Sequence, residues 1–122
     1  MERAVPILPA TDLRVARNFY AGKLGFTVLY DTSGGGTDGI LGLERGSIRI
    51  TIDSPMKGHG RDACVSLLVD SADAWYDEWH AKVEVRRPPK DEYWKARTFD
   101  VIDPFGNTIF VIGPPIPAPA TA

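Results

Sequence analysis

The chain has 122 residues, of which 43% are hydrophobic and 25% charged, the composition of one soluble globular domain. Its formal net charge of −2 argues against a nucleic-acid-binding surface and mildly favours cationic or neutral ligands. Its one cysteine, Cys64, excludes an internal disulfide framework, and no apolar run suits a transmembrane helix or a signal peptide, so we expect a cytoplasmic protein.

Residues 3–9 predict a strand, and the prolines within it suit a strand edge or a strand end. The apolar stripe that follows predicts a helix, because hydrophobic residues recur there at helical spacing. Thr11 or Asp12 can cap its first turn, and Gly25 supplies the left-handed residue that ends it. Residues 26–30 then predict a second strand.

Residues 31–39 are rich in glycine and have no periodicity, which indicates a hairpin connection. Residues 40–53 predict two strands joined around Arg45 and Gly46. In the second of them, apolar and polar residues alternate: Ile48, Ile50 and Ile52 against Arg49, Thr51 and Asp53. The isoleucines are expected to face the helix, which leaves the polar set on the opposite face.

The second half of the chain repeats this order of elements. A predicted strand at residues 63–69 precedes a helix at 70–83, which Asp70 or Ser71 can cap. A short strand is expected near Val83–Val85, followed by a proline-rich loop.

The last predicted elements are the two strands of a hairpin, at residues 97–103 and 107–113. Pro104 suits the turn position whose φ proline restricts, and Gly106 suits a position of positive φ. The tail at residues 114–122 is rich in proline and alanine, so we expect it to be extended or disordered.

Two β-α-β-β-β units in tandem form an internal repeat of about half the chain length. In each unit a helix covers one face of the sheet. In the strand that opens the second unit, the residues left on the other face are Cys64, Ser66 and Leu68. Such a half-polar face is either solvated or lines a concave cleft, and alternation alone does not distinguish the two.

Three segments carry a resemblance to a known family: "AVPILPATDLRVARNFYAGKLGF", "DAWYDEW" and "WKARTFDVIDPFGN". Together they resemble the vicinal oxygen chelate superfamily, which includes glyoxalase I, extradiol dioxygenases and bleomycin resistance proteins. The resemblance implies an α+β fold in which two βαβββ modules have curved mixed sheets that form a cup. It implies one domain at residues 1–113, with modules at about 1–55 and 61–113, and a flexible tail at 114–122.

Enzymes of this superfamily hold a metal with four residues that face the cup. The resemblance places Val5, Arg49, Cys64 and Phe110 at those positions. Valine and phenylalanine have no donor atom and arginine is a permanent cation, so Cys64 alone could ligate a metal. We interpret Cys64 instead as a small buried apolar residue. No metal, no other cofactor and no catalytic residue is therefore expected.

The loss of metal ligands is typical of the bleomycin resistance proteins, which resemble the first segment most closely. That resemblance implies a homodimer that sequesters a planar or cationic antibiotic, such as bleomycin, in clefts across the subunit interface. Tyr30, Trp94 and Gly106 match cleft positions of the family, whereas Ile40 and Ser66 stand where larger aromatic residues are expected. The implied ligand-binding set is Tyr30, Ile40, Arg49, Ser66, Trp94, Gly106 and Phe110.

Several residues also have a purely structural interpretation. Trp75 and Trp79 are at helical spacing, which favours a core or interface role. Arg49 needs an anionic partner, for which Asp100, Asp53 and Glu44 are candidates. The two histidines, His59 and His80, are expected on the surface.

Two other functions remain open from the sequence. One is a metal-dependent enzyme of the same fold whose ligands lie elsewhere, with His59, Asp53 and Cys64 as candidates. The other is a small-molecule sensor or a self-protection protein for another natural product. A shared fold does not separate these functions.

Overall fold

The computed structural model describes residues 2–54 and 62–116 and contains two modules. The first consists of β1 (Ile7–Pro9), α1 (Leu13–Arg17), the π-helix η1 (Asn18–Lys23), β2 (Thr27–Asp31), β3 (Ile40–Arg45) and β4 (Ile48–Asp53). The second consists of β5 (Cys64–Leu68), α2 (Ala72–Trp79), β6 (Lys90–Asp91), β7 (Arg97–Ile102) and β8 (Thr108–Gly113). The predicted tandem βαβββ order is confirmed.

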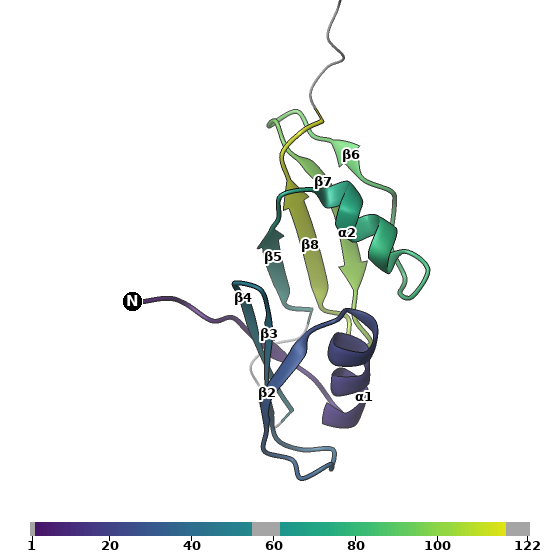
Figure 1. Cartoon of the computed structure of the whole chain (residues 1–122). Coiled ribbons are helices and arrows are strands. Elements are labelled where there is room, and N and C mark those ends of the chain that lie inside the picture. The colour runs from purple at the N-terminus through teal and green to yellow at the C-terminus, as the bar shows by residue number, and fades with distance from the viewer. Residues whose placement is uncertain (1, 55–61, 117–122) are drawn as a thin grey trace, which may run out of the picture.

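Each module has a four-stranded mixed sheet, in the orders β1-β4-β3-β2 and β5-β8-β7-β6. The first and last strands of each module pair in parallel, and the other pairs are antiparallel. Figure 1 shows the two modules end to end, the first below the second, each with its helix beside its sheet. This is the α+β architecture that the sequence predicts.

The first helix begins as predicted but changes its winding midway. The Asp12 carboxylate accepts a hydrogen bond from the backbone N–H of Arg14 at 2.9 Å, so Asp12 is the cap. From Asn18 the helix is of the wider π type, and Leu24 N–H bonds to the carbonyl of Phe19. Gly25 ends it at φ +80°.

In the second module one predicted strand is wrong. Val83–Val85 forms no strand, because Val85 makes only an isolated bridge to Val101. The edge strand β6 forms instead at Lys90–Asp91, inside the predicted loop. Two prolines stand between these positions at 88 and 89, and proline has no N–H for a ladder hydrogen bond. The helix start is as predicted, since the Ser71 hydroxyl accepts from Ala74 N–H.

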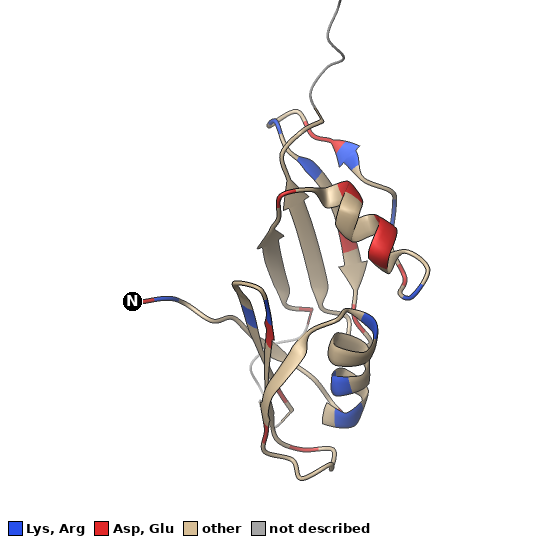
Figure 2. Ribbon diagram, viewed as in Figure 1, with Lys and Arg blue, Asp and Glu red and all other residues tan. Residues whose placement is uncertain are grey.

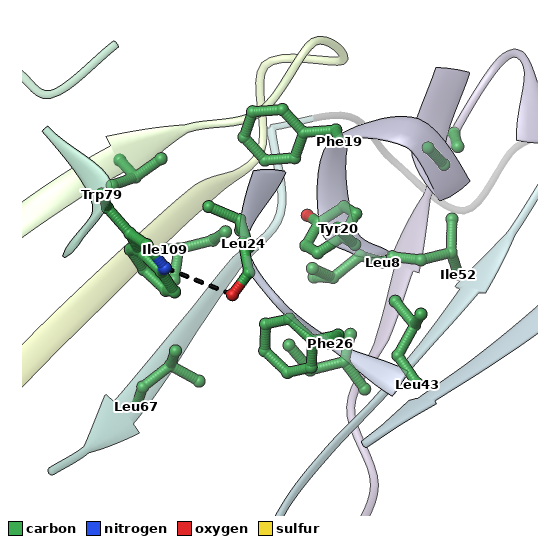
Figure 3. Packing of buried hydrophobic residues seen from close by; sticks show 14 of the residues in the cluster. Leu8, Phe19, Tyr20, Leu24, Phe26, Leu43, Ile52, Leu67, Trp79 and Ile109 are labelled. Carbon is green, nitrogen blue, oxygen red and sulfur yellow. Dashed lines mark hydrogen bonds between the residues drawn. The ribbon is translucent and has the colours of Figure 1, made fainter. Parts of the chain in front are cut away.

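The core runs without a break from one module into the other (Figure 3). Trp79 of α2 is fully buried, and its indole N–H donates to the Leu24 carbonyl at 3.2 Å. Trp75 packs edge-to-face on Trp79, with ring centroids 5.1 Å apart. The predicted core or interface role is confirmed: Trp79 is in the core, Trp75 is partly buried against it, and this part of the core joins the modules.

A buried polar cluster also joins them. The Tyr20 hydroxyl donates to Asp103 at 2.7 Å, and the Asn107 amide donates to Asp103 and to the Pro9 carbonyl, each at 2.8 Å. Asp103 also accepts the backbone N–H of Phe105 and of Asn107, so it shapes the β7–β8 turn. The predicted turn thus serves as the anchor between the modules.

Candidate functional site

Within the residues that the structure describes, each sheet has one face that no helix covers, and these two faces are here called the open faces. On the first open face, Tyr30 is opposite Gly42 in the β2–β3 ladder, and a Cβ added to Gly42 would overlap the Tyr30 ring. Tyr30 is 49% exposed, so its ring covers the glycine while one face stays free. Ile40, opposite Asp53 on β4, is exposed on the same face.

Arg49 lies on this first open face as predicted. Its Nε donates to the Glu44 carboxylate at 2.8 Å, across the β3–β4 ladder. Glu44 is therefore the partner among the three candidate carboxylates, because cross-strand neighbours on one face stand within side-chain reach. The pair is about one-third exposed, so Arg49 still presents a guanidinium to the open face.

The second open face contains a row of four residues, three from β5, β8 and β7 and one from the segment after the Val85–Val101 bridge. Ser66 of β5 is opposite Phe110 of β8, and Phe110 is opposite Asp100 of β7. The fourth member is Arg86, whose backbone N–H donates to the Asp100 carbonyl at 3.2 Å. The structure thus brings the predicted Ser66 and Phe110 together.

Arg86 and Asp100 form the polar end of that row, and sequence analysis did not assign Arg86 to the site. Its guanidinium is 3.2 Å from the Asp100 carboxylate, which is almost fully buried. The signal was present in the alternation: Val85 faces the core, so the next side chain faces the open side. Arg86 was missed because the predicted strand ended at Val85, which placed Arg86 in the loop that follows.

Trp94 and Gly106 do not meet within one chain. Trp94 is half-exposed in the turn before β7, next to Lys95 at φ +62°, and Gly106 is in the turn after β7 at φ +83°. A Cβ on Gly106 would lie 2.7 Å from the Asp62 carboxylate, so this glycine approaches its own chain closely. The predicted ligand-binding residues therefore lie in three places within one chain: on the first open face, on the second open face, and in the turns at the two ends of β7.

The four residues that the resemblance places at the metal positions do not fit a divalent cation. Val5 and Phe110 offer no donor, and Arg49 is bound to Glu44. Cys64 is exposed, so its interpretation as a buried apolar residue is wrong. The reason is that β5 is an edge strand and Cys64 is on its open side, opposite Thr108 rather than Phe110.

The sequence also suggested Asp53, Cys64 and His59 as alternative metal donors. Asp53 ends β4 and Cys64 begins β5, in different sheets, and His59 lies outside the described residues. Over residues 2–54 and 62–116, no group of three His, Cys, Asp or Glu side chains could hold a metal ion. His80 is exposed as expected, and its ring stacks on Tyr76 with centroids 4.8 Å apart.

Among residues 2–54 and 62–116, two surface grooves lie away from the open faces. The larger, of about 600 Å³, runs between the first helix and the β2–β3 connection, and the smaller, of about 390 Å³, lies beside the β7–β8 turn. In the larger one Arg17 is bound to Asp31 at 2.8 Å. Figure 2 shows basic residues along the first helix and acidic residues along α2. In the described part of the chain, no helix is long and apolar enough to cross a membrane.

Comparison with known proteins finds one family profile, described as the Glyoxalase/Bleomycin resistance protein/Dioxygenase superfamily, which matches residues 4–111. A bleomycin resistance protein of Geobacillus stearothermophilus is 28% identical over 129 residues, covering 89% of this chain and 94% of that protein.

Two solved structures extend the comparison. The bleomycin-binding protein of Streptomyces verticillus, in complex with copper(II)-bleomycin, is 26% identical with a TM-score of 0.76, covering 94% of this chain and 98% of that one. The bleomycin resistance determinant of transposon Tn5 has a TM-score of 0.78 at 18% identity, covering 95% and 100%, and is similar in fold.

Proposed function

We propose that this chain, which belongs to the Glyoxalase/Bleomycin resistance protein/Dioxygenase superfamily, sequesters a planar antibiotic of the bleomycin type without transforming it. Its relatives named for bleomycin resistance and bleomycin binding support this function. The observation that carries it is that Phe110 is 38% exposed, at the position that the resemblance assigns to a metal-binding carboxylate. A phenyl ring there can stack on a planar ligand but cannot activate one through a metal.

The functional unit in this proposal is a homodimer with two equivalent clefts. Large apolar side chains are exposed on the open faces of the single chain: Ile7, Tyr30, Ile40, Leu68 and Phe110. Exposed apolar groups on adjacent strands mark an interaction surface. Apposing the first open face of one copy and the second open face of another would place Tyr30 across a cleft from Phe110. Residues 1–113 would then form one ligand-binding domain.

The proposal is tested by titrating the purified protein with bleomycin and following tryptophan fluorescence, with and without EDTA. Quenching is expected in both conditions, with the drug recovered unchanged by mass spectrometry. Trp94→Ala should weaken binding about three- to tenfold, because one aromatic contact is lost. Tyr93→Ala is the matched control, because Tyr93 is next to Trp94 and its side chain is 96% exposed. This variant should bind bleomycin as tightly as the wild type does.

A second arm addresses the aromatic residue of the first open face. Gly42→Ala should displace the Tyr30 ring, because the added methyl group occupies its place. Bleomycin affinity should fall while the fold is retained, since a terminal ring can move. Loss of binding after chelation, or conversion of the drug to a new product, would count against a sequestering protein.

A further inference from the structure

We infer that Arg86, fixed by Asp100 beside Phe110, is a specificity-determining residue that selects planar ligands carrying a carboxylate or a similar anionic acceptor. This inference rests on the proposed function, since it assumes that ligand binds at the second open face. It adds a ligand class: an aromatic ring system with an anionic group at its edge.

The position of Arg86 follows from strand register. Val85 bridges Val101; the Val101 side chain is in the core, and the partly buried Val85 side chain packs against it. Arg86 is therefore directed to the open face, next to Asp100, and Asp100 is the direct cross-strand neighbour of Phe110. Such neighbours are about 5 Å apart, so a ring stacked on Phe110 would bring its edge substituent within reach of the guanidinium.

The second open face is positively charged at its surface near Arg86, because in each ion pair there the arginine is more exposed than the carboxylate. The Arg86 side chain is 55% exposed and that of its partner Asp100 is 7% exposed. The next pair has the same arrangement, with Arg87 at 34% and Glu92 at 18%. Each pair is neutral in sum, but the guanidinium faces outward and the carboxylate lies beneath it. A ligand therefore meets positive charge first.

Of these two guanidiniums, Arg86 is the one available to a ligand. Arg87 donates to the Thr98 carbonyl at 2.7 Å, to the Thr98 hydroxyl at 3.0 Å and to Glu92 at 3.2 Å. Arg86 engages Asp100 through one terminal nitrogen, and within the described residues no hydrogen bond uses its other side-chain N–H groups. The remaining planar donors match the geometry of a carboxylate.

The test uses two fluorescent probes of the same tricyclic shape and opposite charge, anthracene-9-carboxylate and 9-aminoacridine, titrated against the full-length chain at neutral pH. The wild type should bind the carboxylate more tightly than the cation. Arg86→Gln should weaken carboxylate binding about tenfold, the usual loss for a hydrogen bond to a charged group, and should not weaken binding of the cation. Arg86→Lys should retain part of the carboxylate affinity, because it keeps the charge without the planar fork.

Arg14→Gln is the matched control, because Arg14 is also an exposed arginine, paired with Asp12 at 3.1 Å on the first helix. It should leave the affinities for both probes unchanged. Equal losses of both probes in Arg86→Gln, or a wild type that prefers the cation, would overturn the inference and leave sequestration intact. Failure of both probes to bind the wild type would overturn the use of the open face itself.

Discussion

Tyr20 and Asp103, which lie 83 positions apart in the chain, form a buried hydrogen bond of 2.7 Å that ties the first helix to the β7–β8 turn. Tyr20→Phe removes the hydroxyl and leaves one Asp103 oxygen with fewer donors. We expect the free energy of unfolding to fall by about 1–2 kcal/mol, the typical effect of losing one buried hydrogen bond. Urea denaturation measures the change, and Tyr93→Phe, at an exposed tyrosine, should show none.

Because of the Tyr20–Asp103 hydrogen bond and burial, we expect the folded protein to lose stability at alkaline pH. Burial, followed by the nearby charge of Asp103, raises the pKa of Tyr20 far above its usual value. The unfolded chain therefore loses the Tyr20 proton above about pH 10 while the folded chain keeps it, so stability falls as pH rises further. Unfolding curves at several alkaline pH values should show this slope, and Tyr20→Phe should flatten it. An unchanged slope in the variant would assign the effect to other groups.

Arg45 is expected to couple the two modules. It donates to the Leu24 carbonyl at 2.7 Å and to both Glu78 oxygens, and its guanidinium lies 4.1 Å from the Trp75 ring centroid. Arg45→Ala should cost about 2 kcal/mol of unfolding free energy, through the charged hydrogen bonds and the cation–π contact. A double-mutant cycle with Glu78→Gln measures how much of this loss comes from the Arg45–Glu78 interaction. If the two substitutions change the free energy of unfolding additively, the coupling is contradicted.

Glu78 should also contribute to the acid sensitivity of the fold. The Arg45 hydrogen bond holds the pKa of the Glu78 carboxyl below its usual value. Its contribution to stability is therefore present above the unfolded pKa of about 4.3 and is lost as pH falls through the lower folded value. Thermal melts below pH 5 should be less pH-dependent in Glu78→Gln than in the wild type.

Lys95 has φ +62°, in the left-handed region that favours glycine. Lys95→Gly should stabilise the fold by about 1 kcal/mol, because the clash of the Cβ in that conformation is removed. Lys90→Gly, in strand β6, makes the same chemical change without that benefit and should be neutral or destabilising. Equal effects of the two substitutions on the melting temperature would show that Lys95 is not strained.

The exposed thiol of Cys64 should react with iodoacetamide in the native protein, because its strand lies at the sheet edge and its side chain is on the open face. Labelling is followed by mass spectrometry, and Cys64→Ser is the blank, since the chain has one cysteine. Labelling that requires denaturant would show that this part of the open face is covered.

Local signals were enough to predict most of the fold. The alternation of Ile48, Ile50 and Ile52 with polar residues identified the core face of β4, and the last two are fully buried. Gly25 and Gly106 have the positive φ values that their positions suggested. These features are determined by residues that are close together in the sequence, and so the sequence alone is enough to predict them.

The arrangement of the site depended on contacts between distant segments. Cys64 is exposed because β5 is an edge strand of the described sheet and Cys64 is on its open side. Arg49 pairs with Glu44 because of the β3–β4 register. The row from Arg86 to Ser66 exists only when four separate segments align. Periodicity assigns each side chain to a face, but its neighbours across that face follow from pairing and packing free energies summed over the whole chain.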